Sequence, residues 1–445
     1  MAIKRTKQLI KDYPSHAVSI SLLSTIIFGT IVLSLPMCRT TSMSFIDILF
    51  TATSLTTVTG LFTVPLDNFT SIGHVFIMFL MQIGGLGLMT MSLFIMSLFV
   101  DLGLYTQVLA SDILSIQSFK DTKRILLFII KFTFACELLG VIATFCIIRH
   151  DFTFKKAVFL SIFHSVSSFC NVGVSLFSKN KIMYDANIAM VFLTTLLILF
   201  GCLGFVTWHE FFQYFKNKTN HKAFSWHTKI VMRVFFISMA TTSILFWLLE
   251  RNHSLVHMSK IQTFFNILLI GVGTKSAGLI PISMNFLQPA TILILIVTAF
   301  IGSAPSSTGG GVKTSALAIF LAVIKSTIRG RIHVELKGRS IARDQVYKSL
   351  AIISIACSWI LMITFFLLIS EPTHRFLDIL LEAVSAFSNH GMTTRITPYL
   401  TLTGKMLIGL TMIVGRIGAL TLIIGMRRSS DTINYSYPEE RVFLG

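Results

Sequence analysis

Four short segments that end in glycine recur along the chain, and each lies between two long apolar stretches. Their glycines are 113, 105 and 113 residues apart. The segments are Thr57-Val58-Thr59-Gly60, Cys170-Asn171-Val172-Gly173, Lys275-Ser276-Ala277-Gly278 and Ser388-Asn389-His390-Gly391. Because their side chains differ, chemistry common to all four has to come from the backbone. Glycine permits backbone angles that a side chain forbids, and inward carbonyl oxygens can replace the hydration shell of a cation. The spacing indicates a four-fold cation pathway made from one polypeptide.

A second candidate site interrupts the apolar sequence after the third glycine segment. Five of its ten residues are glycine or proline, which break a helix. The segment is Gly302-Ser303-Ala304-Pro305-Ser306-Ser307-Thr308-Gly309-Gly310-Gly311. The sequence is apolar again over residues 316–324, which favours an irregular loop inside the membrane over a cytoplasmic turn. The other three repeats have more regular apolar sequence at this place.

Arg416 lies in the middle of an apolar run, residues 406–424. An arginine so far from a helix end is poorly placed to extend to the membrane surface, so we expect it to face the pathway. Its expected partners are carbonyl or hydroxyl oxygens of residues 303–308. We interpret Arg416 and the loop as a gate beneath the glycine segments, and Lys313 as a further candidate that closes the cytoplasmic end of the loop.

The composition indicates a membrane protein with several spans. The chain of 445 residues is 53% hydrophobic and 13% charged, with a mean hydropathy of +0.78. Apolar runs at residues 18–36, 75–100, 125–148 and 350–369 reach or exceed the roughly 20 residues that span a bilayer. The first run is long and lacks a small-residue cleavage site, so a cleaved signal peptide is not predicted.

The net charge of +18 is distributed unevenly between the connections. With the N-terminus and every second connection assigned to the cytoplasm, the internal connections hold 22 Lys and Arg and the external ones 12. This positive-inside asymmetry predicts both termini in the cytoplasm. A nucleic-acid-binding protein would instead need aromatic and polar residues interleaved with the basic ones on a soluble domain. We therefore expect the lipid bilayer, and no nucleic acid, as the partner of this chain.

A repeat of about 110 residues organises the chain. Each repeat has a long apolar helix, a half-span segment, the glycine turn and a second long helix. The half-span segments, residues 46–57, 157–169, 261–273 and 377–387, are too short to cross a membrane. We predict an all-α polytopic membrane protein in which four pseudo-symmetric repeats place eight spanning helices and four half-helices around a central pore. The predicted boundaries are 16–100, 124–215, 227–328 and 345–425, followed by a cytoplasmic tail, 426–445.

A second register supports these repeats. Gly84, Gly302 and Gly415 each lie 24 residues after the glycine of their segment. In the second repeat the matching Gly201 is displaced by four residues, about one helical turn. Such a shared offset is not explained by the general abundance of glycine in membrane helices.

The chain resembles the superfamily of Trk, Ktr and HKT potassium transporters, and most closely the KtrB-type membrane subunits of the Ktr potassium uptake system. The resemblance covers the chain from about residue 15 to its end. It is carried by Ser54-Leu55-Thr56-Thr57-Val58-Thr59-Gly60-Leu61, Gln82-Ile83-Gly84-Gly85-Leu86-Gly87, Ser276-Ala277-Gly278, Gly302-Ser303-Ala304 and Gly415-Arg416-Ile417-Gly418.

The resemblance implies potassium uptake down its electrochemical gradient into a bacterial cell, with potassium at the filter carbonyls. Glycine at all four filter positions accompanies potassium preference in that family, whereas serine in the first repeat accompanies sodium permeation. Sodium is a second candidate ion, and no cofactor is implied in this chain. The resemblance also implies a homodimer with residues 439–445 at the interface, and a cytosolic ring of KtrA-like or KtrC-like nucleotide-binding subunits on the basic internal face.

Other functions remain open from the residues themselves. A secondary transporter of another small solute would use discontinuous helices, although such folds show two inverted halves. A less selective sodium/potassium pathway is a further alternative. An enzyme is disfavoured, because His209-Glu210 lacks the second histidine of a metalloprotease motif and paired catalytic carboxylates do not recur. His164 and Glu382, nine residues before a filter glycine, are candidates for bracing the half-helices, with simple packing as the alternative. The intramembrane Glu137 is a functional candidate, with simple satisfaction by Lys131 or by donors of the half-helices as the alternative.

Overall fold

The computed structural model describes residues 14–87, 122–177, 187–216, 224–279, 282 and 284–418. The predicted tail 426–445, most of the connection 101–124 and the second half of the apolar run 75–100 lie outside the described residues. The described chain is helical apart from a two-stranded antiparallel hairpin, β1 (Glu335–Leu336) and β2 (Arg339–Ser340).

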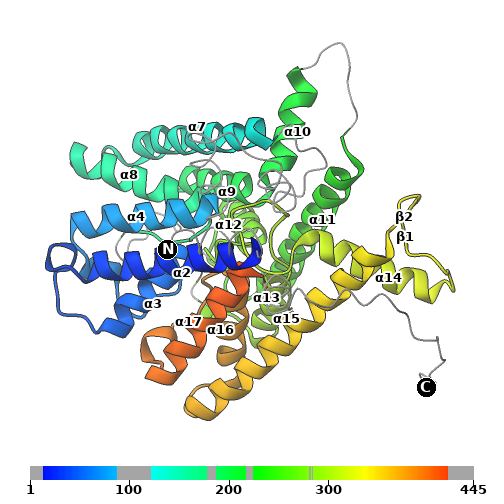
Figure 1. Ribbon diagram of the computed structural model, residues 1–445. Coiled ribbons are helices and arrows are strands. Elements are labelled where there is room, and N and C mark those ends of the chain that lie inside the picture. The colour runs from blue at the N-terminus through cyan, green and yellow to red at the C-terminus, as the bar shows by residue number, and fades with distance from the viewer. Residues whose placement is uncertain are drawn as a thin grey trace, which may run out of the picture.

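The helices fall into four consecutive groups, and in each a long helix precedes a short one of 12 to 16 residues and then a second helix (Figure 1). The first group contains α2 (Pro14–Ser34), α3 (Phe45–Thr56) and α4 (Ser71–Leu86). The second contains α7 (Thr122–Ile148), α8 (Phe154–Phe169), α9 (Ile188–Cys202) and α10 (Phe205–Lys216). The third contains α11 (Trp226–Glu250), α12 (Lys260–Gly273), α13 (Pro289–Phe300) and α14 (Thr314–Ile328). The fourth contains α15 (Arg343–Ser370), α16 (Phe376–Ser388) and α17 (Leu402–Ile417). Single 3-10 turns lie at Pro36–Cys38, Leu66–Asn68, Met284–Phe286 and Thr397–Tyr399.

The second helix of each group starts at a defined distance from the glycine segment. The residues that precede α4, α13 and α17 are Thr70, Gln288 and Thr401, each ten residues after the glycine. Thr70 and Thr401 cap their helices by accepting the backbone N–H three residues later, at 3.2 Å in both cases. The cap of α9, Asn187, comes four residues later than this rule predicts. A longer connection in the second group therefore explains the displacement of Gly201.

In the part of the chain that the structure describes, the second helix of each group ends early or is interrupted, and the number of eight spanning helices stays a prediction. Within the described residues, α7, α11 and α15 are each long and apolar enough to cross a membrane, and α9 with α10 passes the same test as a pair bent by 97°. The other second helices are shorter because α4 ends before Gly87, α17 ends before Gly418, and residues 301–313 separate α13 from α14. The other three groups have more regular apolar sequence at this place, but they do not keep a continuous helix there either. Gly87, Gly204 and Gly418 adopt positive φ angles of 80°, 84° and 87°, which a helix does not accommodate.

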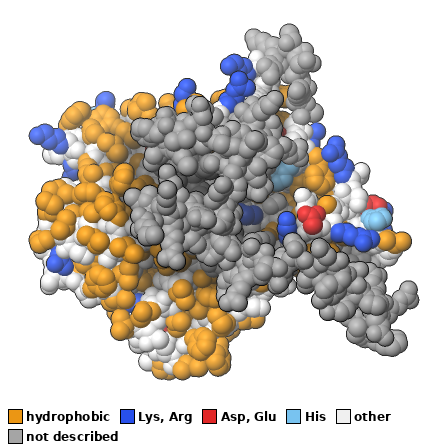
Figure 2. Space-filling view, viewed as in Figure 1, with side chains coloured by type: hydrophobic (Ala, Val, Ile, Leu, Met, Phe, Trp, Pro, Cys, Tyr) orange, Lys and Arg blue, Asp and Glu red, His pale blue; other side chains and the backbone are white. Residues whose placement is uncertain are grey.

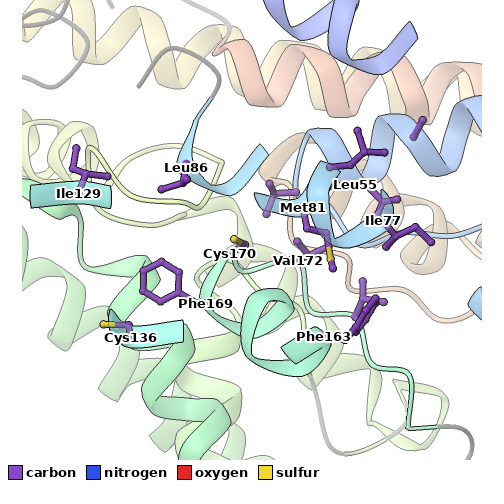
Figure 3. Packing of buried hydrophobic residues seen from close by; sticks show 14 of the residues in the cluster. Leu55, Ile77, Met81, Leu86, Ile129, Cys136, Phe163, Phe169, Cys170 and Val172 are labelled. Carbon is purple, nitrogen blue, oxygen red and sulfur yellow. The ribbon is translucent and has the colours of Figure 1, made fainter. Parts of the chain in front are cut away.

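The four groups contact one another in a closed cycle. The second helix of each group packs on the short helix of the next: α4 on α8, α9 on α12, α13 on α16, and α17 on α3. A buried apolar cluster joins the first two groups (Figure 3), with Leu55 and Met81 from the first and Phe163, Phe169 and Val172 from the second. The short helices and glycine segments therefore lie in the interior of the molecule.

The long helices face outward with apolar side chains. Ile27 of α2, Leu139 of α7, Ile237 of α11 and Leu361 of α15 are all exposed. Figure 2 shows hydrophobic side chains over most of the described surface at the left of the view. Such a surface is stable only against lipid, because water would not solvate it.

Candidate functional site: a ring of four glycine segments and a polar loop

Three of the four short helices end in the same hydrogen-bond pattern. After α3, the N–H of Val58 donates to the carbonyl of Leu55 at 3.2 Å, and the N–H of Thr59 donates to that of Ser54 at 2.8 Å. Val58 itself is left-handed, with a φ of 61°. These features define a Schellman motif, which satisfies the last carbonyls of a helix and turns the chain away from its axis. The same bonds recur after α8 and α16, where the left-handed residues are Asn171 and Asn389.

The third segment deviates from this pattern. The N–H groups of Ala277 and Gly278 both donate to the carbonyl of Gly273, at 3.0 Å, and only the glycine is left-handed. Lys275 of this segment is buried, and its Nζ lies 3.5 Å from the carbonyl oxygen of Thr298 in α13. The amine therefore lies behind the segment, against the second helix of its own group.

The four terminal glycines form a closed ring of backbone contacts. Their φ angles are all positive, at 86°, 73°, 56° and 77° in chain order. A side chain on Gly60 would collide with the carbonyl oxygen of Val172. The same collision would occur between Gly173 and Ala277, between Gly278 and His390, and between Gly391 and Thr59. Each glycine thus faces the carbonyl that precedes the glycine of the next segment, and the fourth segment returns to the first.

Side chains tie neighbouring segments together behind this ring. Asn389 Nδ2 donates to Thr59 Oγ1 at 2.8 Å and to the carbonyl of Met412 at 3.0 Å. His390 Nε2 lies 2.6 Å from the carbonyl oxygen of Thr274, which links the fourth segment to the third. These bonds are inside the protein, since all five residues are fully buried.

The sequence analysis missed a serine that supports the segments. Ser54 Oγ accepts the N–H of Gly60 at 3.0 Å, and Ser167 Oγ accepts the N–H of Val174 at 2.8 Å. Ser385 occupies the same place in the fourth group. The sequence does contain a pattern that could have identified them, because each of the three serines lies six residues before the glycine of its segment.

The predicted polar loop lies in the break between α9 and α10. The N–H groups of Ala304 and Thr308 donate to the carbonyls of Cys202 and Gly201, at 3.1 and 3.2 Å, and the N–H of Phe205 donates to Ser306 at 2.8 Å. All residues from 302 to 311 are buried or half-buried. The loop therefore satisfies backbone groups that the broken helix leaves unpaired, as irregular backbone at membrane depth requires.

Arg416 and Lys313 both bind this loop. Arg416 donates to the carbonyl of Thr308 at 2.6 Å, and its other terminal nitrogen donates to the carbonyl of Gly84 in α4. Lys313 Nζ donates to the carbonyl of Gly309 at 2.5 Å and to Ser303 Oγ at 3.3 Å. A further bond joins loop and ring, since Asn171 Nδ2 donates to Thr308 Oγ1. The structure thus brings together the predicted gate residues, and Gly84 is a partner of Arg416 that the sequence did not indicate.

The remaining polar candidates join elements of the fold. His164 Nε2 lies 3.0 Å from Thr194 Oγ1, and Glu382 accepts a hydrogen bond from Thr397. Both contacts brace a short helix against a neighbouring element. Glu137 accepts a bond from Gln82 Nε2 at 3.2 Å, which joins α7 to α4.

A cavity of about 360 Å³ opens beside the ring. Gly60 and Gly173 line it, together with Phe62, Asp67 and Phe177. The ring is therefore accessible from this cavity at Gly60 and Gly173.

Comparisons with known proteins agree over nearly the whole chain. Residues 2–435 match the family TrkH, described as cation transport protein. The chain is 30% identical to the Ktr system potassium uptake protein B of Bacillus subtilis over 100% of both chains. It is 32% identical to the protein of the same name from Vibrio alginolyticus, covering 96% of this chain and 94% of that one. It is 29% identical to the potassium/sodium uptake protein NtpJ of Enterococcus hirae, again over 100% of both.

A solved structure shares the fold. The crystal structure of the potassium transporter TrkH from Vibrio parahaemolyticus superposes with a TM-score of 0.72 at 18% identity, and the match covers 93% of this chain and 84% of that one. The described chain is thus an all-helical, multi-pass membrane protein of the same architecture. Together with the match over residues 2–435, this places the chain in the TrkH family of cation transport proteins, a family of transporters and not of enzymes.

Proposed function

We propose that this protein takes up potassium across the cell membrane through the ring of four glycine segments. The observation that carries the proposal is the closed sequence of contacts, in which each glycine faces the carbonyl of the next segment. Backbone carbonyls arranged around one axis can replace the water shell of a potassium ion. Three relatives at about 30% identity are named for potassium or potassium/sodium uptake, which supports the same ion.

In this proposal each group of helices is one pore repeat. The repeats are assigned to residues 16–100, 124–215, 227–328 and 345–425, and the short helices α3, α8, α12 and α16 are the pore half-helices. Their C-terminal ends point at the ring, so the negative ends of the helix dipoles favour a cation there. The residues before the glycines, Thr59, Val172, Ala277 and His390, can differ because the carbonyls alone contact the ion.

We assign the gate to Arg416 and the loop 302–311. The guanidinium of Arg416 holds the carbonyl of Thr308 and presents a positive charge below the ring. Passage of a cation then requires the loop to leave the break between α9 and α10 and Arg416 to move with it. Lys313 restrains the opposite end of the loop through Gly309.

The names of the same relatives suggest how this chain assembles with other subunits. Two of them are named as parts of a Ktr system, so we propose that this chain is the membrane subunit of such a system. In it the chain forms a homodimer in the cell membrane, with both termini in the cytoplasm, and a KtrA-like or KtrC-like nucleotide-binding ring acts on the gate from below.

The second candidate is a less selective sodium/potassium pathway. One specific observation favours it, since the third segment lacks the second left-handed residue of the other three. The name of the Enterococcus hirae relative includes sodium as well. A solute transporter of two inverted halves is less compatible, because the four groups contact one another head to tail in one cycle.

The test is uptake by a bacterial strain that lacks its own potassium uptake and expresses this chain with or without a cytosolic ring subunit. The unaltered chain should restore growth at low potassium. Gly60→Ser should lower the preference for potassium over sodium at least tenfold, about 1.4 kcal/mol, because its side chain would displace the carbonyl of Val172.

The matched control is Gly409→Ser in α17, where an added side chain meets only open space. Its preference for potassium over sodium should stay within twofold of that of the unaltered protein. Failure of a well-inserted, unaltered protein to restore growth under either condition would contradict potassium uptake. Equal preference in Gly60→Ser and in the control would contradict the ring as its filter.

A further inference from the structure

A cavity of about 430 Å³ lies between α11, the last turns of α14 and the β-hairpin that follows. Figure 1 shows α14 and the hairpin at the side of the molecule, beyond α11. The wall is apolar where Val234 of α11 faces Ala318, Leu321 and Ala322 of α14. None of the ring or loop residues described above lines it, so this cavity is separate from the proposed pathway.

The chemistry of the cavity changes along the axis of α14. Ala318 and Ala322 are followed on the same helical face by Lys325 and Arg329, because residues three and four apart share a face. The rise from Ala318 to Arg329 is about 16 Å at 1.5 Å per residue. Leu321, on the apolar half, has 51% of its surface exposed. One end of the cavity therefore suits hydrocarbon and the other end suits an anion.

The hairpin adds positive charge at the cationic end. Lys337 and Gly338 form its two-residue turn, with φ angles of 49° and 76°, as a type I′ turn requires. This turn places Lys337 at the cavity. The N–H groups of Arg331 and Glu335 bind the carbonyl and the hydroxyl of Ser326, at 3.0 and 3.2 Å, which fixes the hairpin against α14.

The charges at this end are not balanced. Arg331 forms an ion pair with Glu335, the one acidic residue that lines the cavity. Lys325, Arg329 and Lys337 make no ion pair within the part of the chain that the structure describes. Figure 2 shows Lys and Arg side chains beside an acidic one in this region, at the right of the view.

We infer that this cavity binds an anionic phospholipid. The phosphate lies between Lys325, Arg329 and Lys337, and an acyl chain follows the apolar wall at Val234 and Leu321. Basic pockets between membrane helices are suited to acidic lipid headgroups. A free phosphate or a nucleotide would leave the apolar half without a partner, and a zwitterionic lipid would leave the three positive charges uncompensated.

The experiment measures lipid retention by the purified full-length protein in detergent, by titration with phosphatidylglycerol and native mass spectrometry. Phosphatidylcholine and inorganic phosphate are the comparison probes. The double variant Lys325→Gln/Arg329→Gln should bind phosphatidylglycerol about 25-fold more weakly, at about fivefold per positive charge. The unaltered protein should bind phosphatidylcholine at least tenfold more weakly than phosphatidylglycerol.

The matched control is Arg339→Gln/Arg343→Gln, which removes the same charge from the same connection but outside the cavity. It should retain phosphatidylglycerol within twofold of the unaltered protein. Leu321→Trp tests the apolar half, because it fills the acyl path and leaves every charge in place. It should weaken phosphatidylglycerol binding at least fivefold.

Three results would overturn the inference. The first is an equal loss of lipid in the control and the cavity variant. The second is competition by inorganic phosphate at the same concentration as the lipid, which would mean that the headgroup alone is bound. The third is an unchanged lipid affinity with loss of binding to a purified cytosolic ring subunit, which would assign the surface to a protein partner.

Discussion

At the scale of single residues, the ring is shaped by left-handed residues that follow the short helices. Asparagine, which tolerates this conformation, holds the position in the second and fourth segments, but the first has the β-branched Val58. Such a residue stores roughly 1–3 kcal/mol of strain and persists only where its surroundings enforce it. Val58 is buried and packs against Gly84 of α4, so the packing of the first group holds it in place.

At the same scale, the side chain of Arg416 is expected to limit cation flux. Arg416→Gln removes a positive charge and the donors to Thr308 and Gly84, so cation flux through the closed state should rise at least tenfold. Arg416→Lys keeps the charge, but an ammonium lacks the planar fork that bridges two carbonyls. Cation flux should therefore rise less in Arg416→Lys than in Arg416→Gln. Rubidium uptake into vesicles measures both, and unchanged flux in both variants would exclude Arg416 from the gate.

Broken second helices are the main feature at the scale of elements. Gly84, Gly201 and Gly415 each lie fourteen residues after the cap of their helix, and each faces a carbonyl at the end of a short helix, namely that of Thr56, Phe169 or Phe387. The glycines thus allow the second helix to cross the end of a short helix closely. Glu250 and Glu371, at the ends of α11 and α15, accept the N–H groups of Gln288 and Thr401, the residues that precede α13 and α17.

The break between α9 and α10 depends on Gly204. Its φ of 84° and the nearby carbonyl of Pro305 leave no place for a side chain. Gly204→Ala should cost about 1–2 kcal/mol of unfolding free energy for the left-handed backbone alone, and should loosen the loop that binds there. Gly409→Ala, in a regular helix with open space around it, should instead stabilise by about 0.5–1 kcal/mol. Unfolding in mixed micelles compares the two, and equal stabilities would contradict this account.

At the scale of the whole molecule, the contact between the fourth group of helices and the first closes the cycle. There α17 packs on α3, and Lys405 Nζ lies 2.8 Å from the carboxylate of Asp47. Both side chains are only 15% exposed, so solvent screens this pair less than a surface pair. These residues are separated by most of the chain, and their contact holds the first group of helices against the last.

A double-mutant cycle tests this closure. Asp47→Asn and Lys405→Met should each destabilise the protein, and their coupling energy should be about 1 kcal/mol, since the pair is partly buried. The control pair is Asp344 and Lys348, which are 3.8 Å apart and mostly exposed, and it should show no measurable coupling. Additive effects at Asp47 and Lys405 would mean that packing alone closes the cycle.

The amino-acid sequence by itself determined the class of this protein and the positions of its special segments. A chain with so many apolar residues can bury them only in lipid, so composition indicates the class directly. A short apolar helix is recognised by its length, and the expected starts and ends of α3, α12 and α16 therefore differ from the observed ones by at most one residue. The glycines were identified by repetition, because a backbone conformation that only glycine adopts easily preserves that residue type when others change.

Only the tertiary structure decided which segments meet. The bend between α9 and α10 was not foreseen, because an apolar helix that breaks inside a protein keeps its apolar composition when another loop supplies the missing hydrogen bonds. The contacts of Arg416 with Gly84 and of Asn389 with Thr59 join residues more than 300 positions apart, and no local pattern encodes such partners. They exist because the four groups of helices close into one cycle, which places the first and last segments side by side.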